Sequence, residues 1–447
     1  MIIGAVVGLV ANYSMRTHQR AINDIVIGIL GAFIGGFLFN LVGIVGVTDF
    51  NILSTIAALI GAMMLLIVIR LLNRRQIKNI HLLEDATADH LVEPIQPRNI
   101  LYGPLVKIDR LRVHQLALVG LIVLLPLLDM ALLLVRIPNI SSRPPLFGMI
   151  ETYSDENGQL DYLVYTPSDY QPDTETPLLV LLHGCMQDPY ILETASAMRS
   201  VADENNFMVV YPQQNAISSP HRCWNWYDKD NQQRDRGEPA LLIGVVDQVK
   251  QNYSVDANRV YIAGISSGGA MTCIMASCYR DVFAAAAVHS GMAYESSNSI
   301  FQALAAPLSG SQLSPEIAGQ DAYECSGTEQ QTIPVIVLHG MIDSVVIPVN
   351  ADDTLEQMAQ MDDYADDGTD NDSVLAQPTS TETRQVEGGH TYTVENFEFG
   401  GELLLQRYLI DGLWHMWSGG SGIPPLSDPQ APNASQIFWD FFQSHPM

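Results

Sequence analysis

Residues 258–277 read NRVYIAGISSGGAMTCIMAS, and this stretch decides which fold the sequence predicts. An apolar, strand-like run leads into two serines boxed by glycines, and a helix-forming segment follows them. The residues 264–268 (GISSG) fit the pattern G-x-S-x-G, whose central serine occupies a sharp turn between a strand and a helix. Glycines suit such a turn because the strained backbone and the close-packed helix leave no room for Cβ atoms. We interpret Ser266 as a nucleophile, and a plain glycine turn is the alternative.

Short apolar runs alternate with helical segments on both sides of this turn, from about Met149 onward. The strand-like runs are LDYLVYTP (160–167), PLLVLLHG (177–184), FMVVYP (207–212), FAAAAVHSG (283–291) and IPVIVLHG (333–340). Helical segments are expected over 193–205 and 239–252. The alternation predicts βαβ units and a mostly parallel, doubly wound sheet with helices on both faces. Catalytic groups on such sheets gather at the carboxyl ends of the strands.

A serine nucleophile needs a histidine to take its proton and an acid to orient that histidine. On this kind of sheet the expected chain order is Ser, then Asp or Glu, then His. Asp343 follows a predicted strand and is the candidate acid, with a turn aspartate as the alternative. Of the later histidines, His390 falls inside a predicted hairpin strand and His445 lies next to the C-terminus. His415, in the loop DGLWHMWSGG, is therefore the candidate base.

Backbone N–H groups must stabilise the oxyanion that such a nucleophile generates. One should come from Ser267, directly after the nucleophile, and another from the loop LVLLHGCMQ, which offers Cys185. A glycine turn with a disulfide cysteine is the alternative for this loop, and the two interpretations are compatible. His183 and His339 end strands upstream of the required position, so we expect structural roles for them.

Tryptophans near these motifs are candidates for the walls of a substrate pocket, although aromatic residues are as often part of the core. The three candidates are Trp224, Trp226 and Trp417. Arg236 and Glu238 are expected to form a structural pair or a helix start. The acidic run 351–372 is expected to be a solvated helix and loop, with a calcium site as the alternative. We expect neither a metal nor an organic cofactor.

All of the cysteines lie in the C-terminal part of the chain: Cys185, Cys223, Cys273, Cys278 and Cys325. An odd count leaves at least one cysteine unpaired or paired between chains. If this part of the chain is exported, Cys185–Cys223 is the first candidate bridge and Cys278–Cys325 the second. The sequence leaves the connectivity open.

Charge is distributed unevenly along the 447 residues. Residues 1–136 contain 11 Lys and Arg against 8 Asp and Glu, so 41 of the 49 acidic residues lie beyond Arg136. The formal net charge of −27 is therefore the sum of −30 in the C-terminal part, with 11 basic and 41 acidic residues, and +3 in residues 1–136. Such an acidic surface argues against nucleic-acid binding and fits a soluble domain.

The N-terminal part contains apolar segments of the length that crosses a bilayer, roughly 30 Å of hydrocarbon. These segments are residues 1–13, which would barely span, 21–47, 52–72 and 115–135. They predict an all-α transmembrane bundle ahead of the soluble domain. The expected parts are a three-helix transmembrane domain (1–75), a cytoplasmic linker (76–113), a fourth transmembrane helix (114–137) and a hydrolase domain (145–447).

Basic residues orient this bundle, because loops rich in Lys and Arg stay in the cytoplasm. Arg16 and Arg20 lie between the first two spans, the loop 48–51 has no base, and the linker is basic. With four spans, everything after Arg136 lies outside. We therefore expect a multi-pass protein of a bacterial inner membrane, with its soluble domain on the periplasmic or extracellular side. Glycines at small-xxx-small spacing in the spans allow helix-mediated self-association.

Two resemblances follow from these motifs. Residues 1–75, with GILGAFIGGF at their centre, resemble the small three-helix transglycosylase-associated membrane proteins. Residues 150–447 resemble poly(3-hydroxybutyrate) depolymerase-type esterases, a group close to feruloyl and acetylxylan esterases. The segments that carry this resemblance are LHGCMQ, CWNWYDKDNQQRDRGEPALL, VYIAGISSGGAM, FAAAAVHSGMAY, LHGMID and WHMWSGG. The resemblance implies an α/β-hydrolase fold and ester hydrolysis by Ser266, Asp343 and His415.

The sequence is therefore interpreted as a membrane-anchored serine esterase that acts on hydroxyalkanoate polyesters, their oligomers or small esters through an acyl-enzyme. Secreted polymer depolymerases usually carry a surface-binding domain, and this chain ends soon after its last predicted helix, which favours soluble substrates. One alternative is a feruloyl or acetylxylan-type carbohydrate esterase. Another is a non-catalytic membrane scaffold, and a third is a fusion of two halves with unrelated roles. The expected partners are an ester substrate and the lipid bilayer.

Overall fold

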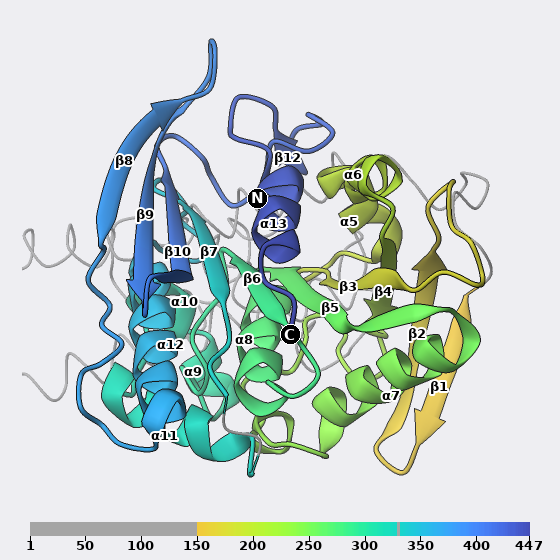
Figure 1. Ribbon diagram of the computed structural model, residues 1–447, viewed down its shortest axis with the longest axis horizontal. Helices are drawn as coiled ribbons and strands as arrows, with labels where there is room; N and C mark the ends of the chain where they lie inside the picture. The colour runs from red at the N-terminus through yellow and green to blue at the C-terminus, as the bar shows by residue number, and fades with distance from the viewer. Residues whose placement is uncertain (1–149, 329–330) are drawn as a thin grey trace, which may run out of the picture. The chain divides into compact units, whose positions relative to one another are not determined.

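The computed structural model describes residues 150–328 and 331–447, which build the predicted soluble domain (Figure 1). The predicted transmembrane segments and the linker 76–113 lie outside the described residues. Among the residues that are described, no helix has both the length and the apolar character needed to cross a membrane. The expected domain boundaries and the expected topology therefore stay predictions.

Ten strands of the described chain form one sheet, in the order β1-β2-β4-β3-β5-β6-β7-β10-β9-β8, and β11 pairs with β12 apart from it. Their bounds are β1 Glu151–Asp155, β2 Gly158–Tyr165, β3 Thr176–Leu182, β4 Met208–Gln213, β5 Val255–Ile265, β6 Ala285–His289, β7 Val335–Gly340, β8 Ser380–Gln385, β9 Thr391–Phe399, β10 Glu402–Ile410, β11 Trp417–Ser418 and β12 Ser427–Asp428. Every pairing from β4 to β10 is parallel, and the strands at both edges are antiparallel. The predicted mostly parallel sheet is confirmed.

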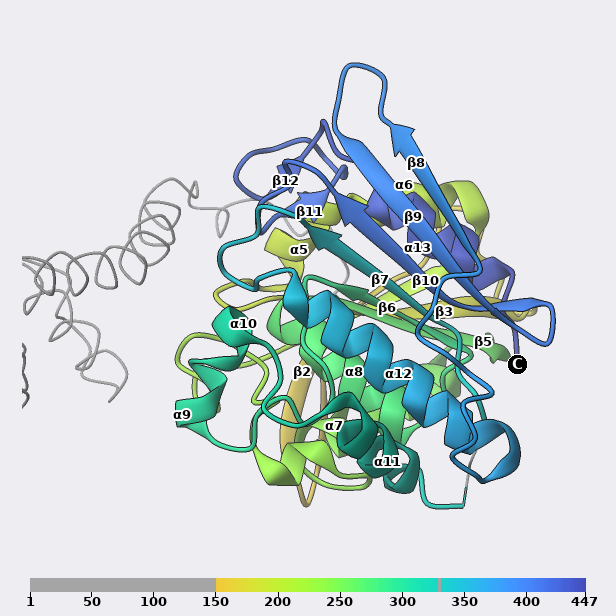
Figure 2. The same ribbon diagram turned by 90° about the vertical axis from the view of Figure 1, so that its left-hand side faces the viewer.

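Helices cover both faces of this sheet, as the alternation of strands and helices predicts. Their bounds are α5 Pro189–Ser196, α6 Met198–Asn205, α7 Gly237–Asn252, α8 Ser267–Cys278, α9 Ile300–Ala303, α10 Ala306–Ser309, α11 Pro315–Cys325, α12 Val349–Asp367 and α13 Ala434–Gln443, with the 3₁₀ turn η2 Lys229–Gln232. Figures 1 and 2 show α7, α8, α11 and α12 on one face and α5, α6 and α13 on the other. The helix predicted over 193–205 is two helices, because Ala197 between them adopts a left-handed conformation with φ of 51°.

The core consists of two apolar layers, one on each face of the sheet. In β3, Leu178, Val180 and Leu182 pack into the layer beneath α7 and α8. The alternate residues Leu179 and Leu181 pack into the layer beneath α5, α6 and α13. A parallel strand that is buried on both faces reads as a continuous apolar run, which explains why PLLVLLHG contains no polar alternation.

Candidate active site

Ser266 occupies the turn between β5 and α8 and has φ of 59° and ψ of −123°. A positive φ is rare for a residue with a Cβ atom and persists only where the surrounding structure holds it. The backbone N–H of Ser266 is held by the carbonyl oxygen of His289, at 3.0 Å. Ser266 is partly exposed, whereas Ser267 is buried with 2% of its surface accessible. The turn therefore presents the first serine and hides the second.

The glycines around Ser266 are required by close backbone contacts. A Cβ atom on Gly264 would lie 2.3 Å from the carbonyl oxygen of Gly268. A Cβ atom on Gly268 would lie 2.4 Å from the carbonyl oxygen of Leu182, at the end of β3. Real Cβ atoms do not approach that closely, so any side chain would push α8 away from the strand ends. These contacts confirm the strand–turn–helix arrangement that GISSG predicts.

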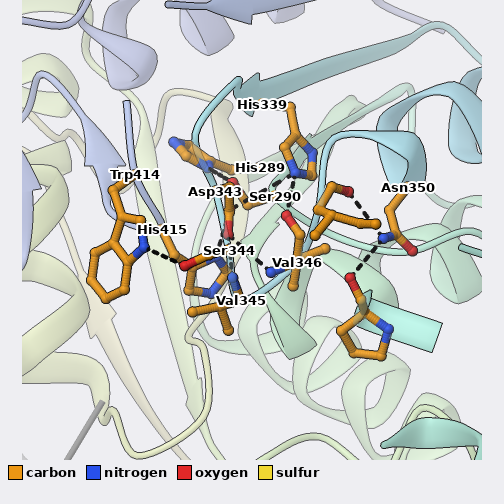
Figure 3. Close-up of polar contacts among 12 residues, drawn as sticks. His289, Ser290, His339, Asp343, Ser344, Val345, Val346, Asn350, Trp414 and His415 are labelled. Carbon is orange, nitrogen blue, oxygen red and sulfur yellow. Dashed lines mark hydrogen bonds and ion pairs between the residues drawn. The ribbon is translucent and has the colours of Figure 1, made fainter. Parts of the chain in front are cut away.

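His415 and Asp343 form a hydrogen-bonded pair. Nδ1 of His415 lies 2.7 Å from Oδ2 of Asp343, and the carboxylate is fully buried (Figure 3). The other carboxylate oxygen accepts the backbone N–H groups of Val345 and Val346, each at 2.9 Å. Burial opposes ionisation of Asp343, but the neighbouring His415 and these hydrogen bonds outweigh it and hold its pKa below the usual range. Asp343 is thus an anion that fixes the orientation of the His415 ring.

The three candidate residues follow the carboxyl ends of parallel strands. Ser266 follows β5, Asp343 follows β7 and His415 follows β10. These strands run parallel in one sheet, so their carboxyl ends lie at one edge, where catalytic groups of such folds gather. The structure therefore places the candidate nucleophile at the edge that also carries the hydrogen-bonded pair of His415 and Asp343.

His289, at the end of β6, is a residue that sequence reasoning did not select. Its carbonyl oxygen holds Ser266, and its Nε2 accepts the backbone N–H of Ser418 at 3.1 Å. Burial lowers its pKa to about 3, so the ring is neutral and Nε2 is free to accept. The available signal was its position, since it ends the apolar run FAAAAVHSG at the same sheet edge.

The loop after β3 lies against Ser266. A Cβ atom on Gly184 would lie 3.2 Å from the Cβ atom of Ser266. Within the described part of the chain, no acceptor takes the backbone N–H of Cys185 or of Ser267. Cys185 follows the residue that lies against Ser266, and Ser267 follows Ser266 directly, so both N–H groups remain candidates for an oxyanion hole.

Both predicted disulfides are present. Cys185 is bonded to Cys223, and Cys278 is bonded to Cys325. Cys273 is the remaining thiol; it is buried, which raises its pKa to about 12 and makes it unreactive. The first bridge joins the loop beside Ser266 to the CWNW segment, and the second joins the end of α8 to the end of α11.

The predicted roles of the tryptophans need correction. Trp224 and Trp417 are fully buried and Trp226 is 6% exposed, so all three belong to the core. The indole N–H of Trp224 donates to the carbonyl oxygen of His183 at 3.0 Å, and that of Trp417 donates to Ser435 at 3.1 Å. Neither offers a free face to a substrate in this structure.

Trp414 is the partly exposed aromatic side chain next to His415. Its indole N–H donates to Oγ of Ser344 at 2.9 Å, beside Asp343 (Figure 3). Trp414 lies three residues before Trp417, the first residue of β11, and the sequence pointed to Trp417, the one of the two that the structure buries.

The remaining predicted features are structural. The predicted helix start is confirmed, since Arg236 directly precedes α7 and Glu238 lies in its first turn. The two residues do not pair: Arg236 contacts Asp230 at 3.5 Å, and Glu238 is buried. The acidic run forms α12 and a loop, as predicted, with Asp362 and Asp363 buried on its inner side. In residues 150–328 and 331–447, no group of three or more His, Cys, Asp or Glu side chains is arranged to hold a metal ion.

The chain matches two known families in separate regions. Residues 160–378 match the family described as Esterase PHB depolymerase, and residues 25–74 match the family described as Transglycosylase associated protein. In fold, the chain is similar to the acetyl xylan esterase from Aspergillus awamori, with a TM-score of 0.51 and 21% sequence identity. That similarity covers 66% of this chain and 99% of the other, and it supports the α/β-hydrolase fold.

Curated relatives of the chain include a polyester depolymerase and a feruloyl esterase. Poly(3-hydroxyalkanoate) depolymerase C of Paucimonas lemoignei is 31% identical over 267 residues, which cover 60% of this chain and 60% of the relative. Feruloyl esterase B of Thermothelomyces thermophilus is 30% identical over 223 residues, which cover 47% of this chain and 74% of the relative. These matches agree with the turn at Ser266 and with the mostly parallel sheet. The chain belongs to the family of poly(3-hydroxybutyrate) depolymerase-type esterases and is a carboxylic ester hydrolase.

Proposed function

We propose that this esterase works through a triad in which Ser266 attacks the ester carbonyl, His415 takes the serine proton and Asp343 holds His415. The observation that carries the proposal is the 2.7 Å hydrogen bond between Nδ1 of His415 and Oδ2 of Asp343, at the sheet edge that bears the Ser266 turn. Because the buried carboxylate of Asp343 accepts the Nδ1–H of His415, Nε2 of His415 is left as the proton acceptor. The same carboxylate stabilises the imidazolium that forms.

The backbone N–H groups of Ser267 and Cys185 stabilise the negative charge on the carbonyl oxygen of the tetrahedral intermediate. His415 then gives its proton to the leaving alcohol, and the acyl group stays on Ser266. A water molecule repeats the sequence with His415 as base, releasing the acid and restoring the free serine. In acylation and again in deacylation, His415 takes one proton and gives it back, so the cycle consumes only ester and water.

The proposed substrates are hydroxyalkanoate oligomers or small esters, supported by the similarity to depolymerase C. A second candidate is an ester of a polysaccharide, supported by the similarity to feruloyl esterase B. Relative kcat/KM on a 3-hydroxybutyrate trimer and on methyl ferulate separates the two. A clear preference for the trimer supports the first assignment, and a preference for the ferulate supports the second.

Membrane anchoring belongs to the same proposal. It is supported by the apolar segments in the sequence and by the match of residues 25–74 to the Transglycosylase associated protein family. The esterase domain would then act at the outer side of the membrane, where a disulfide such as Cys185–Cys223 is stable. A reporter enzyme fused after Arg136 tests this: activity of a periplasm-dependent reporter supports the topology, and activity of a cytoplasm-dependent one contradicts it.

The triad is tested by two neighbouring substitutions assayed with p-nitrophenyl butyrate. Ser266→Ala should abolish turnover, because the nucleophile is lost. Ser267→Ala should keep much of the activity, because its contribution is a backbone N–H that alanine retains. Full activity in Ser266→Ala would refute the assignment.

A further inference from the structure

Glu238 is a buried carboxyl group whose position the triad does not explain. It lies in the first turn of α7, only 8% exposed. No Lys, Arg or His of the described chain pairs with it; burial raises its pKa to about 7, and Asp228 adds to that effect. A buried carboxyl group without a basic partner is costly unless several hydrogen bonds satisfy it.

The hydrogen bonds of Glu238 converge on two segments. Oε2 accepts the backbone N–H of Asn225 at 2.8 Å, and Oε1 accepts the side-chain amide of Asn225 at 2.6 Å. Oε1 also accepts the side-chain amide of Gln214. In return, the backbone N–H of Glu238 donates to Asn231 at 2.8 Å, and Asn231 donates to the carbonyl oxygen of Asn225 at 3.0 Å. Asn225 is therefore fixed through its backbone and its side chain together.

Both segments hold the loop that carries Cys185. The backbone N–H of Gln214 donates to Nε2 of His183 at 3.0 Å. The indole N–H of Trp224, next to Asn225, donates to the carbonyl oxygen of His183, also at 3.0 Å. The disulfide Cys185–Cys223 is the third link. Glu238 thus holds Gln214 and Asn225, and the two segments that contain these residues are joined to residues 183–185 by three connections.

The loop that receives these connections has little freedom of its own. Nδ1 of His183 donates to the carbonyl oxygen of Gly184 at 2.8 Å, and burial lowers the pKa of His183 to about 4, which keeps the ring neutral. The backbone N–H of Gly184 donates to Gln187 at 2.9 Å. Among the residues that the structure describes, no acceptor takes the N–H of Cys185, so its direction is set by the neighbours that hold residues 183 and 184.

We propose that Glu238 is a positioning residue: through Asn225, Gln214 and the bridge to Cys185, it aims the Cys185 N–H at the oxyanion. The inference rests on the proposed roles of Ser266 and Cys185. Glu238 touches neither substrate nor nucleophile, and its effect is on geometry that matters only when charge develops in the transition state.

The first test is Glu238→Gln, which keeps the side-chain shape and replaces one acceptor oxygen with a donor group. The assay is run at pH 8, above the pKa of Glu238, where three donors face an ionised carboxylate and the amide must break or weaken at least one of these hydrogen bonds. We expect kcat for p-nitrophenyl butyrate to fall about 10-fold or more per active site, with KM within about twofold. The concentration of active sites is measured by the burst with a fluorophosphonate ester, so a loss of folded protein is not counted.

Asp362→Asn is the matched control. Asp362 is also fully buried and also carries a raised pKa, of about 8, caused by burial. It accepts the backbone N–H of Ile333 at 3.0 Å and makes no hydrogen bond to the loop 183–187 or to residues 223–225. The kcat per active site of the Asp362→Asn variant should stay within twofold of that of the wild type.

A second pair of variants covers the case in which Glu238→Gln does not fold. Trp224→Phe removes the hydrogen bond to His183 and should lower kcat alone, as Glu238→Gln does. Trp439→Phe is its control, because Trp439 is buried and its indole N–H has no hydrogen-bond partner among the described residues.

Unchanged kcat per active site in both Glu238→Gln and Trp224→Phe would overturn the positioning role, as would equal losses in the two controls. These outcomes are distinct from failure of the triad itself. If Ser266→Ala keeps its activity, the proposed function is wrong; if Ser266→Ala is inactive while the Glu238 and Trp224 variants are fully active, only the positioning role is wrong.

Discussion

Nε2 of His289 accepts the backbone N–H of Ser418 at 3.1 Å, and this bond ties the end of β6 to the loop that follows His415. The carbonyl oxygen of the same histidine holds Ser266. One buried residue therefore holds both segments, the Ser266 turn through its backbone and Ser418 through its ring, and Trp417 stacks on that ring with centroids 5.2 Å apart.

His289→Leu should destabilise the protein by about 1–3 kcal/mol, because the buried N–H of Ser418 would lose its acceptor. The measurement is urea denaturation followed by fluorescence. His390→Gln is the control: His390 bonds to Asp428 at 2.9 Å in a partly buried pair, and glutamine can still donate a hydrogen bond to Asp428, so the change should cost less than about 1 kcal/mol. Equal stability losses in the two variants would contradict the special role of the Ser418 hydrogen bond.

Asp343→Asn should leave the fold intact and lower kcat by about 10³- to 10⁴-fold, since the amide favours the wrong tautomer of His415 and supplies no negative charge. Steady-state kinetics with p-nitrophenyl butyrate measures the loss. Asp428→Asn breaks the other Asp–His pair, with His390, and should leave kcat within about threefold. If the two variants lose activity equally, the pair at His415 is not the catalytic one.

Asp362 should make stability depend on pH in one direction. Its pKa is about 8 in the folded protein, because burial disfavours the charged form, against an ordinary value of 3.8. Between these two pH values Asp362 is protonated in the folded state and ionised in the unfolded state. Its contribution to the free energy of unfolding is therefore complete below about pH 4 and is lost as pH rises through 8.

The wild type should therefore lose stability relative to Asp362→Asn as pH rises from about 4 to 8, by at most about 1.4 kcal/mol per pH unit. Urea denaturation of both proteins at pH 5, 6, 7 and 8 provides the comparison. A constant difference in unfolding free energy over this range would show that Asp362 does not titrate as its burial implies.

The two disulfides should differ in what their removal does to catalysis. They span 38 and 47 residues, so the loss of either should cost about 4 kcal/mol on chain-entropy grounds. Replacing Cys185 and Cys223 with serine should also lower kcat, because the loop beside Ser266 loses a link. Replacing Cys278 and Cys325 with serine should leave kcat per active site unchanged. Equal effects on kcat would argue that the first bridge has no catalytic consequence.

Much of the domain could be predicted because its signals are local. The glycine spacing around Ser266 and the apolar runs that end at His339 and His183 each depend on a few adjacent residues. The expected chain order of nucleophile, acid and base then indicates Asp343 as the acid and His415 as the base after Ser266. In the structure, Asp343 and His415 are hydrogen-bonded to each other. Cys185–Cys223 and Cys278–Cys325 were selected as bridges and are present.

The features that sequence analysis missed depend on contacts between distant segments. Trp414 and Trp417 are three residues apart, and the contacts of Trp417 with the distant residues His289 and Ser435 decide which of the two is buried. The hydrogen bonds of Glu238 reach Gln214 and Asn225, so its inward orientation is not visible in the run RGEPALL. The antiparallel edge formed by β1 and β2 likewise depends on pairing partners rather than on local pattern.

Covalent labelling of the nucleophile tests the central claim most directly. The protein is treated with a fluorophosphonate ester, digested, and the modified residue is identified by mass spectrometry. We expect one phosphonylated residue, Ser266, no label in Ser266→Ala, and normal labelling in Ser267→Ala. An adduct on another residue, or label retained at full stoichiometry in Ser266→Ala, would contradict the proposal that Ser266 is the nucleophile of this esterase.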